Sequence, residues 1–240
     1  MRVMALTSSP SRVAGLRALG ARPIVGNLDD APSLRRLAGL ATRVLHLAPP
    51  PVEGAGGNAW WLDPRTIALA RVSGTPRAQR RVNAETAVRH LGRAGVQASV
   101  LRIPGIYAPD REGGTPEARL RRGTPVLVAE DDVFTNHIHA DDLARACMAA
   151  VWKGLSQRTY NVSDATHLKM GDYFDLAADL YGLPRPPRVP RTAAQEQLSL
   201  MLLSFMSESR RLDNQRMVRE LGLRLRYPSV AEGLSGQPQR

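Results

Sequence analysis

The feature that most constrains the fold is an alternation between short apolar segments and segments with helical spacing of apolar residues. Residues 2–7 (RVMALT) are largely apolar, and apolar residues then recur at helical spacing over 13–19. Residues 22–28 and 42–48 are further apolar segments, separated by another helical pattern. Apolar strands separated by helices are typical of a parallel sheet with helices on both faces. The sequence therefore predicts an α/β fold with a doubly wound parallel sheet.

The alternation continues to residue 164, with one interruption. A helix is expected over 84–95, a strand from 96 that runs into a loop by 107, a helix over 140–152 and a strand over 158–164. Two helical patterns, however, are separated only by SGTP at 73–76. In doubly wound sheets each helix normally returns the chain to a new parallel strand. We therefore expect an incomplete sheet that lacks one strand at this point.

The last third has a different character. A proline-rich stretch precedes a long helical pattern over 193–223, which we expect to break near Ser207. The pattern favours a division into an α/β domain, residues 1–164, and a small, mostly helical C-terminal lobe, residues 165–240. Methionine and leucine residues over 198–206 suit a core or a dimer contact. An incomplete sheet leaves an open edge, so a homodimer is one expected outcome.

Charge and composition bear on the class of partner. The net charge is +11, but only two of the 33 basic residues are lysines, and the arginines are scattered along the chain. Aromatic residues make up 5% of the chain, and none interleave with a basic segment as in proteins that stack bases. We therefore predict no nucleic-acid partner. No apolar stretch reaches the roughly 20 residues needed to cross a bilayer, and the single cysteine, Cys147, fits a reducing cytoplasm.

The carboxyl ends of the predicted strands are candidate ligand-binding positions, because open parallel sheets bind ligands beyond these ends. They are Thr7 with Ser8, Asn27 with Leu28, Leu47 with Ala48, and Pro104 with Gly105. The segment 54–59 (GAGGNA) matches a dinucleotide-binding pattern formally, but prolines separate it from the preceding strand. We interpret that segment as a loop.

Two histidines, His137 and His139, precede Asp141 and Asp142 at the start of the helix over 140–152. A metal site is conceivable there, but the sequence offers no third spaced ligand. An aspartate before an apolar helical pattern most simply caps the helix N-terminus. We predict that role and no metal.

Several segments together resemble the NAD-dependent epimerase/dehydratase family of extended or atypical short-chain dehydrogenase/reductases. They are LRIPGIYAPDR (101–111), NHIHADDLARA (136–146), YNVSD (160–164) and SRRLDNQRMVRELGLRLRYPSVAEGL (209–234). The resemblance covers nearly the whole chain. It implies a Rossmann-like NAD(P)-binding domain over 1–164, a substrate lobe over 165–240 and a small-molecule substrate.

Two family features are not matched. The family begins with a strand and a glycine-rich turn, and this chain starts after the place where that unit would stand. The family also has a tyrosine and a lysine at the front of the helix that begins near residue 77. Anchoring the pattern on Glu85 places Arg77 at the tyrosine position and Arg81 at the lysine position. An arginine stays protonated up to about pH 12 and cannot exchange protons near neutral pH as that tyrosine does.

The resemblance also implies positions for a cofactor, NAD or NADP. Thr7 and Ser8 would lie near the adenosine ribose, Asn27 and Leu28 by the adenine, Leu47 and Ala48 along the pyrophosphate, and Pro104 near the nicotinamide. Arg81 could hydrogen-bond a ribose or phosphate, whereas Arg111 and His137 would face the substrate. The functional hypothesis is an NAD(P)-dependent oxidoreductase or epimerase for a nucleotide-sugar-type substrate. The alternative is a degenerate, non-enzymatic binding protein.

Overall fold

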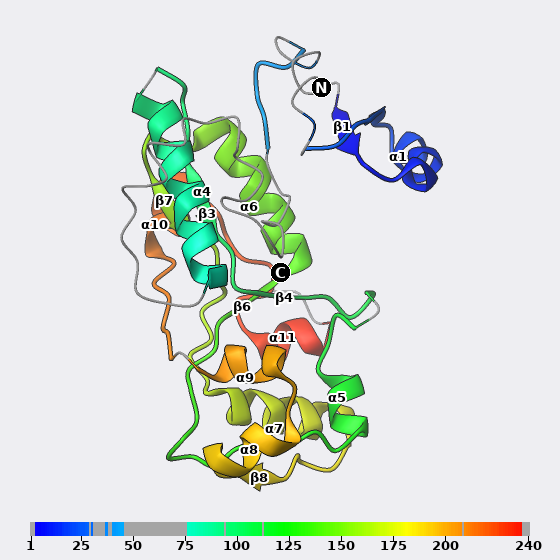
Figure 1. Cartoon of the computed structure of the whole chain (residues 1–240), viewed down its shortest axis with the longest axis vertical. Coiled ribbons are helices and arrows are strands. Elements are labelled where there is room, and N and C mark those ends of the chain that lie inside the picture. Colours follow the sequence, from blue (N-terminus) through cyan, green and yellow to red (C-terminus); the bar gives the residue numbers. More distant parts are fainter. Residues whose placement is uncertain are drawn as a thin grey trace. The chain divides into compact units, whose positions relative to one another are not determined.

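The computed structural model describes residues 3–28, 30, 37, 40–45, 76–93, 95–111, 113–207 and 209–236. Within these ranges, side chains are not described at 76–81, 91, 200, 201 and 204. The chain divides into two compact units, Met1–Ala98 and Ser99–Arg240. Figure 1 shows the elements of both units, and each unit is treated separately below.

The first unit opens with a strand–helix–strand motif. Strand β1 (Met4–Thr7) leads through a 3-10 turn η1 (Pro10–Arg12) and helix α1 (Val13–Ala18) to strand β2 (Arg22–Val25). The two strands are parallel, in a register that pairs Met4 with Arg22 and Thr7 with Val25. Gly20 makes the turn before β2 with a positive φ of 80°, which glycine adopts without strain. The first predicted strand, helix and strand are therefore confirmed.

The other described helix of this unit is α4 (Pro76–Arg93), which contains the predicted helix start at 77–85. Gly95 follows it with a φ of 93°, so the predicted stop at this glycine is confirmed. Of the predicted strand over 42–48, residues 42–45 are described and are not in a strand. The predicted gap between the helical patterns, at 73–76, lies almost wholly outside the described residues.

The described residues of the second unit form three parallel strand pairs. Strand β3 (Val100–Arg102) pairs with β7 (Thr159–Asn161), β4 (Gly105–Tyr107) with β6 (His137–His139), and β5 (Val126–Leu127) with β8 (Arg188–Val189). The single strand expected over 96–107 is thus two strands, β3 and β4. Pro104 lies between them and has no amide hydrogen to continue a strand ladder. The chain changes partner there, from β7 to β6.

Helices of the second unit confirm one prediction and correct another. Helix α6 (Ala140–Lys153) occupies the predicted helix over 140–152. The helical pattern over 193–223 breaks near Ser207 as predicted, because α9 (Leu200–Met206) ends there and α10 (Gln215–Leu221) begins later. A second break, at 198–199, was not predicted and separates α8 (Arg191–Gln197) from α9. The remaining helices are α5 (Glu117–Arg121), α7 (Met170–Tyr181) and α11 (Val230–Leu234).

Two asparagine side chains from distant parts of the sequence, one just before β6 and one in β7, bind the extended stretch between α9 and α10. The Asn136 side chain donates to the Arg210 carbonyl (2.8 Å) and accepts from the Leu212 amide (2.9 Å). The Asn161 side chain donates to the Asp213 carbonyl (3.0 Å). These bonds satisfy backbone groups that a continuous helix would have paired internally.

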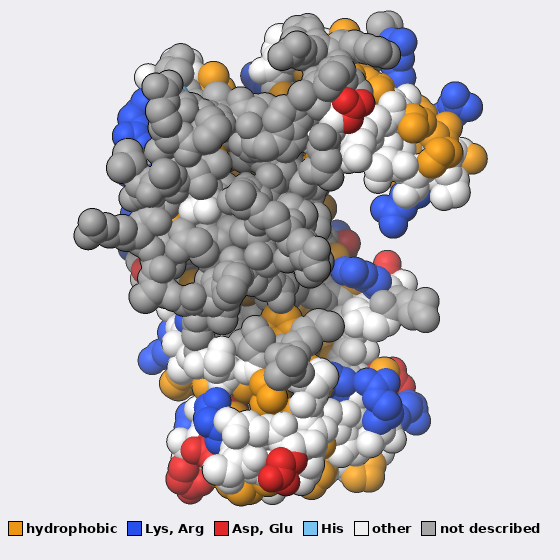
Figure 2. All heavy atoms as spheres, viewed as in Figure 1, with side chains coloured by type: hydrophobic (Ala, Val, Ile, Leu, Met, Phe, Trp, Pro, Cys, Tyr) orange, Lys and Arg blue, Asp and Glu red, His pale blue; other side chains and the backbone are white. Residues whose placement is uncertain are grey.

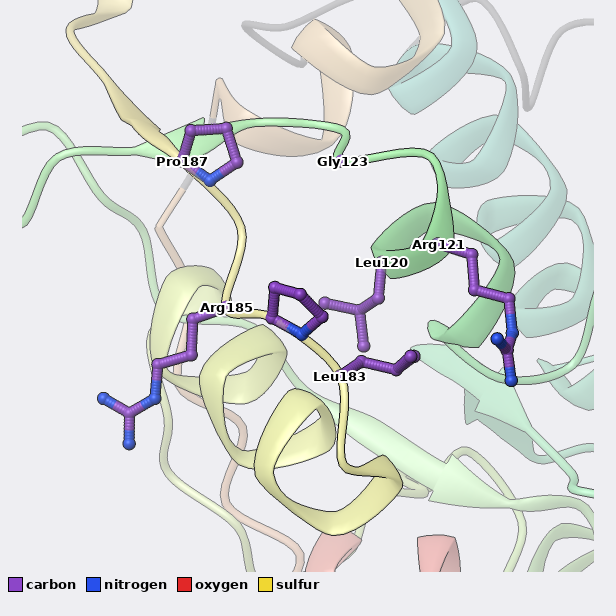
Figure 3. Close-up of a pocket in the computed structure, with 7 residues that line it drawn as sticks. Leu120, Arg121, Gly123, Leu183, Arg185 and Pro187 are labelled. Atoms are coloured by element: carbon purple, nitrogen blue, oxygen red, sulfur yellow. The ribbon is translucent and has the colours of Figure 1, made fainter.

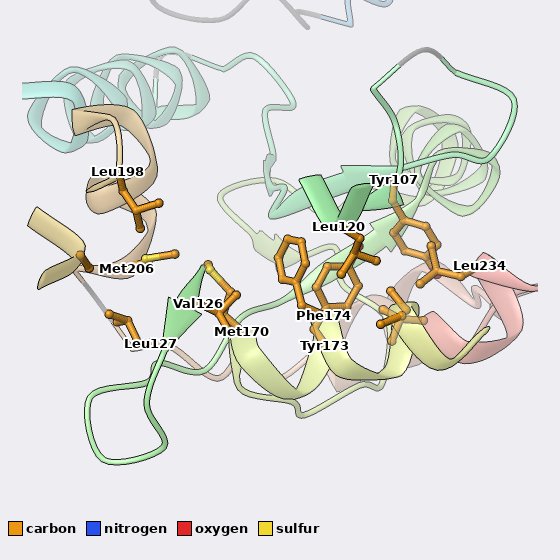
Figure 4. Packing of buried hydrophobic residues seen from close by; sticks show 14 residues of the cluster. Tyr107, Leu120, Val126, Leu127, Met170, Tyr173, Phe174, Leu198, Met206 and Leu234 are labelled. Carbon is orange, nitrogen blue, oxygen red and sulfur yellow. The ribbon is translucent and has the colours of Figure 1, made fainter. Parts of the chain in front are cut away.

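Two hydrophobic clusters form the core of the second unit. One packs α6 and α10 against the strands, and its fully buried members include Ile138, Tyr160 and Leu221. The other lies around α7, where Tyr173 and Phe174 pack with residues of β4, α5 and α11, as Figure 4 shows. The α/β fold class with parallel strands is confirmed, whereas the domain boundary at 164 and 165 remains a prediction.

Candidate functional site

The carboxyl ends of β1 and β2 form one part of the predicted ligand-binding edge. The Gly26 amide donates to the Thr7 carbonyl (3.0 Å), so Thr7 with Ser8 and Asn27 with Leu28 lie at the same edge of this strand pair. The Thr7 hydroxyl accepts from the Ser9 amide (3.2 Å) and fixes the turn. Ser8 and Asn27 are exposed, so their side chains are accessible to a ligand.

Three other predicted cofactor contacts cannot be placed fully. Leu47 and Ala48 lie outside the described residues, as does the GAGGNA segment at 54–59. Arg81 lies in the first half of α4, where its backbone is helical and its side chain is not described. Arg77 also lies in this helix, and its side chain is likewise not described.

In the second unit, Pro104 and His137 are neighbours, whereas Arg111 lies in a surface turn. Gly105, which follows Pro104, pairs with His137 across β4 and β6. Arg111 is exposed, and its amide donates to the Ala108 carbonyl (3.3 Å). His137 is only 8% exposed. Of the two residues predicted to face the substrate, Arg111 alone is accessible to solvent.

The environment of His137 keeps its imidazole neutral. The ring stacks on Tyr173, with centroids 4.1 Å apart, and meets the edge of Tyr107 at 6.3 Å. Burial lowers the pKa of His137 from 6.5 to about 4, because water no longer solvates the charged form. The Nδ1 atom is buried without a hydrogen-bond partner among the described residues.

Asp164 was not singled out as a site residue in the sequence, yet it has an unusual environment. It follows β7, so the same strand-end rule that selected Pro104 would have selected it. The residue is 2% exposed, and its Oδ2 atom is buried with no described partner. Burial raises the pKa of this carboxyl from 3.8 to about 7, although a hydrogen bond from the Thr166 amide opposes the shift. The nearby carboxylates of Asp142 and Glu232 raise it further.

Helix α6 is not capped as predicted. The N-cap residue is His139, whose Nδ1 atom accepts from the Asp141 amide (3.2 Å). Asp142 is completely buried and instead accepts from the backbone amides of Arg226 (2.9 Å) and Tyr227 (2.8 Å). The capping prediction was wrong, because this aspartate joins α6 to a segment more than 80 residues away in the sequence.

A pocket of about 420 Å³ lies between the end of α5 and the loop after α7, as Figure 3 shows. Its apolar wall includes Leu120 and Leu183, and two arginines lie at its rim. Arg121 pairs with Glu117 at 2.7 Å. Arg185 pairs with Asp179, also at 2.7 Å, so both rim guanidinium groups already have carboxylate partners.

Beside this pocket, Arg119 lies over the Phe174 ring, 4.2 Å from its centroid. Its Nε and Nη2 atoms are buried without hydrogen-bond partners in the described part of the chain, and burial lowers the pKa of this guanidinium. The aromatic face supplies an electrostatic contact that compensates in part.

Charged surface side chains, potential metal ligands and helix length bear on which partners the described residues can bind. On the face in Figure 2, basic side chains occur in separate groups with acidic ones among them. Within the described ranges, no three His, Cys, Asp or Glu side chains are placed to hold a metal ion together. No described helix combines the length and the apolar character that crossing a membrane requires.

The parallel strand pairs, the strand–helix–strand start and the helices that follow place this chain among α/β proteins with a Rossmann-like fold. No protein-family model matches the sequence, and no curated protein matches it either.

Several solved structures have a similar fold. The chain is similar to a conserved protein of unknown function from Silicibacter pomeroyi, with 26% identity and a TM-score of 0.76 over 98% of this chain and 89% of the other. It is also similar to a nucleoside-diphosphate-sugar epimerase from Pseudomonas aeruginosa, with 18% identity and a TM-score of 0.70 over 97% and 86%.

A third similar structure is a dTDP-glucose 4,6-dehydratase from Streptomyces venezuelae, solved with NAD bound. The identity is 19% and the TM-score is 0.68, over 98% of this chain and 86% of the other. The structures similar to this chain therefore include NAD-dependent epimerase and dehydratase structures. At these identities the likeness concerns the fold.

Proposed function

We propose that this chain binds NAD or NADP and acts as an oxidoreductase or epimerase on a nucleotide-sugar-type or related small substrate. The observation that carries the proposal is the fold, which matches NAD-binding epimerase and dehydratase structures over nearly the whole chain. Residues 1–164 would form the cofactor-binding domain and residues 165–240 the substrate lobe.

The accessible polar edge of β1 and β2 supports the cofactor site. Ser8 and Asn27 are exposed there, immediately beyond the strand ends, where open parallel sheets bind nucleotides. The proposed cofactor contacts are Thr7, Ser8, Asn27, Leu28, Leu47, Ala48, Arg81 and Pro104. The proposed substrate contacts are Arg111, which is exposed, and His137, which is buried and stacks on Tyr173.

A second candidate is a binding protein without catalysis. It is favoured by Arg77 and Arg81, which stand where the family pattern has its proton-exchanging tyrosine and its lysine. Because a guanidinium group stays protonated at neutral pH, these residues could hold a phosphate or ribose but could not exchange a substrate proton.

The test is calorimetric titration of the full chain with NAD and with NADP, after circular dichroism has shown that the chain is folded. Ser8→Arg adds a cation where the ribose 2′-phosphate of NADP would lie and should improve NADP affinity about tenfold relative to NAD. Ala18→Arg adds the same charge at the exposed far end of α1 and should leave that ratio unchanged. Absence of binding by a folded sample, or an equal response of the two variants, would refute the cofactor site.

Turnover separates the two candidates once binding is shown. The protein with its cofactor bound is incubated with a nucleotide sugar such as UDP-glucose, and the sugar products and the reduced nicotinamide cofactor are measured. Turnover establishes the enzyme, whereas tight cofactor binding without turnover over a panel of nucleotide sugars favours the binding protein.

A further inference from the structure

The buried carboxyl of Asp164 stands at the junction between the end of β7 and the C-terminal part of the chain. Its amide donates to the His137 carbonyl (2.8 Å), and its Oδ1 atom accepts from the Thr166 amide (2.9 Å). The Oδ2 atom is sealed from solvent and has no described hydrogen-bond partner. A buried ionised oxygen with no donor is costly, whereas a protonated one is much less so.

Burial and two neighbouring carboxylates raise the pKa of Asp164. The Asp142 carboxylate lies on α6 and the Glu232 carboxylate on α11, and both disfavour the ionised form of Asp164. The phenols of Tyr107 on β4 and Tyr173 on α7 also interact with it electrostatically. No lysine or arginine pairs with Asp164 in the described part of the chain, and the hydrogen bonds from the amide and side chain of Thr166, which lower its pKa, do not outweigh burial.

The residues around Asp164 hold the C-terminal segment, defined here as residues 226–236. The Ala165 amide donates to the Pro228 carbonyl (2.9 Å), and the Thr166 hydroxyl accepts from the Val230 amide (3.0 Å). Thr166 is therefore shared: its amide binds the Asp164 carboxyl and its hydroxyl binds the first residue of α11. A change of charge on Asp164 acts directly on the loop that anchors this segment.

We propose that Asp164 is a protonation switch: its neutral form keeps the C-terminal segment docked on the 163–166 loop, and its ionised form weakens that docking. The inference does not depend on the proposed cofactor or substrate. Because burial raises the pKa of Asp164 to about 7, the switch operates in the physiological range.

The sign follows from proton linkage. The docked state holds the proton up to about pH 7, whereas an exposed aspartate releases it near pH 4. Docking is therefore strongest at low pH and weakens as the pH rises from about 4 to 7. With a pKa of about 7 in the docked state and about 4 in the open state, the equilibrium constant for opening of the segment increases about thirtyfold between pH 5.5 and 8.0.

Amide hydrogen exchange of the full chain, corrected for the chemical exchange rate at each pH, measures this opening at Ala165 and Val230. In Asp164→Asn the side chain keeps its shape but cannot ionise. His137 is present in both proteins, so its titration cancels in the ratio of their opening equilibria, and this ratio isolates the effect of Asp164. Asp179→Asn is the control, because the Asp179 carboxyl is exposed and its pKa is lowered by Arg185, away from this pH range.

The expected result is a ratio that rises about thirtyfold from pH 5.5 to 8.0 for wild type against Asp164→Asn, with Asp179→Asn behaving as wild type. A ratio that stays constant overturns the switch, and so does an equal rise at the amides of α7, which would indicate general rather than local opening. Should Asp164→Asn fail to fold, the wild-type rise at Ala165 and Val230 relative to α7 decides the question alone.

Discussion

Replacing Asp142 by asparagine tests whether this buried carboxylate is a structural connection between α6 and the C-terminal segment. Its Oδ1 atom accepts from the Arg226 amide (2.9 Å) and from Arg145 (2.9 Å), and its Oδ2 atom accepts from the Tyr227 amide (2.8 Å). An asparagine can place an oxygen at only one of these positions. Its NH₂ group must then face at least one amide donor, which is left buried and unpaired.

The magnitude follows from these contacts. An unsatisfied buried donor costs about 1–3 kcal/mol, and the lost charge on the remaining acceptor weakens a further backbone bond by about 1 kcal/mol. The Arg145 contact contributes little, because its side chain is 41% exposed and screened by water. Removing the Asp142 charge also relieves its repulsion with the Asp164 carboxyl, which offsets a small part of this loss. We expect the free energy of unfolding to fall by about 3 kcal/mol.

The assay is urea unfolding followed by far-ultraviolet circular dichroism, with Asp141→Asn as the matched control. Asp141 is the preceding residue, its side chain is 54% exposed and its nearest cation, Arg226, is 3.9 Å away. A change within about 0.5 kcal/mol is expected for it. Equal unfolding midpoints for the two variants would show that the buried hydrogen bonds of Asp142 do not contribute to the free energy of unfolding.

Two further predictions concern packing and pH. Gly233→Ala should destabilise the chain by about 2 kcal/mol, because a Cβ there would clash with the Tyr107 hydroxyl oxygen. In Gly15→Ala the new Cβ meets no atom within 4 Å, and the change should stabilise α1 by about 0.5–1 kcal/mol. Thermal unfolding compares the two, and a stable Gly233→Ala variant would contradict the close contact. His137 has a folded pKa of about 4, so its contribution to stability is complete above pH 6.5 and is lost as the pH falls to 4. In urea titrations, the free energy of unfolding of wild type relative to His137→Phe should therefore fall by about 3 kcal/mol as the pH falls from 6.5 to 4. A difference independent of pH would refute the lowered pKa of His137.

The two buried titrations in this unit have opposite signs. Between about pH 4 and 6.5, stability falls with rising pH because of Asp164 and rises with pH because of His137. The wild-type profile should therefore be flatter than either contribution alone. Comparison with a single variant, in which one titration is removed, separates the contributions.

Local sequence patterns were sufficient for the elements that depend on neighbours in the chain. The apolar spacing of residues 2–28 predicted β1, α1 and β2, and the glycine at 95 marked the end of α4. The same periodicity predicted α6. These features follow from residues three or four positions apart, whose side chains share a helix face, and from backbone freedom at single glycines.

Other features depended on partners that a local pattern does not contain. The sequence predicted the break near Ser207 but not its hydrogen-bond partners, Asn136 and Asn161, which lie at least 50 residues away. Asp142 binds backbone amides 84 and 85 residues away, so capping chemistry alone misassigned it. The pKa values of His137 and Asp164 also depend on the tertiary structure, because burial is the largest cause of both shifts.

The sequence by itself determined the α/β class, the parallel arrangement of its strands and the polar residues at the ends of β1 and β2. Only the tertiary structure decided which polar groups are buried, which of them lack partners and which long-range contacts replace a continuous helix. The reason is physical: helix and strand propensities act over a few residues, whereas desolvation and hydrogen-bond pairing depend on what the rest of the chain places around each atom.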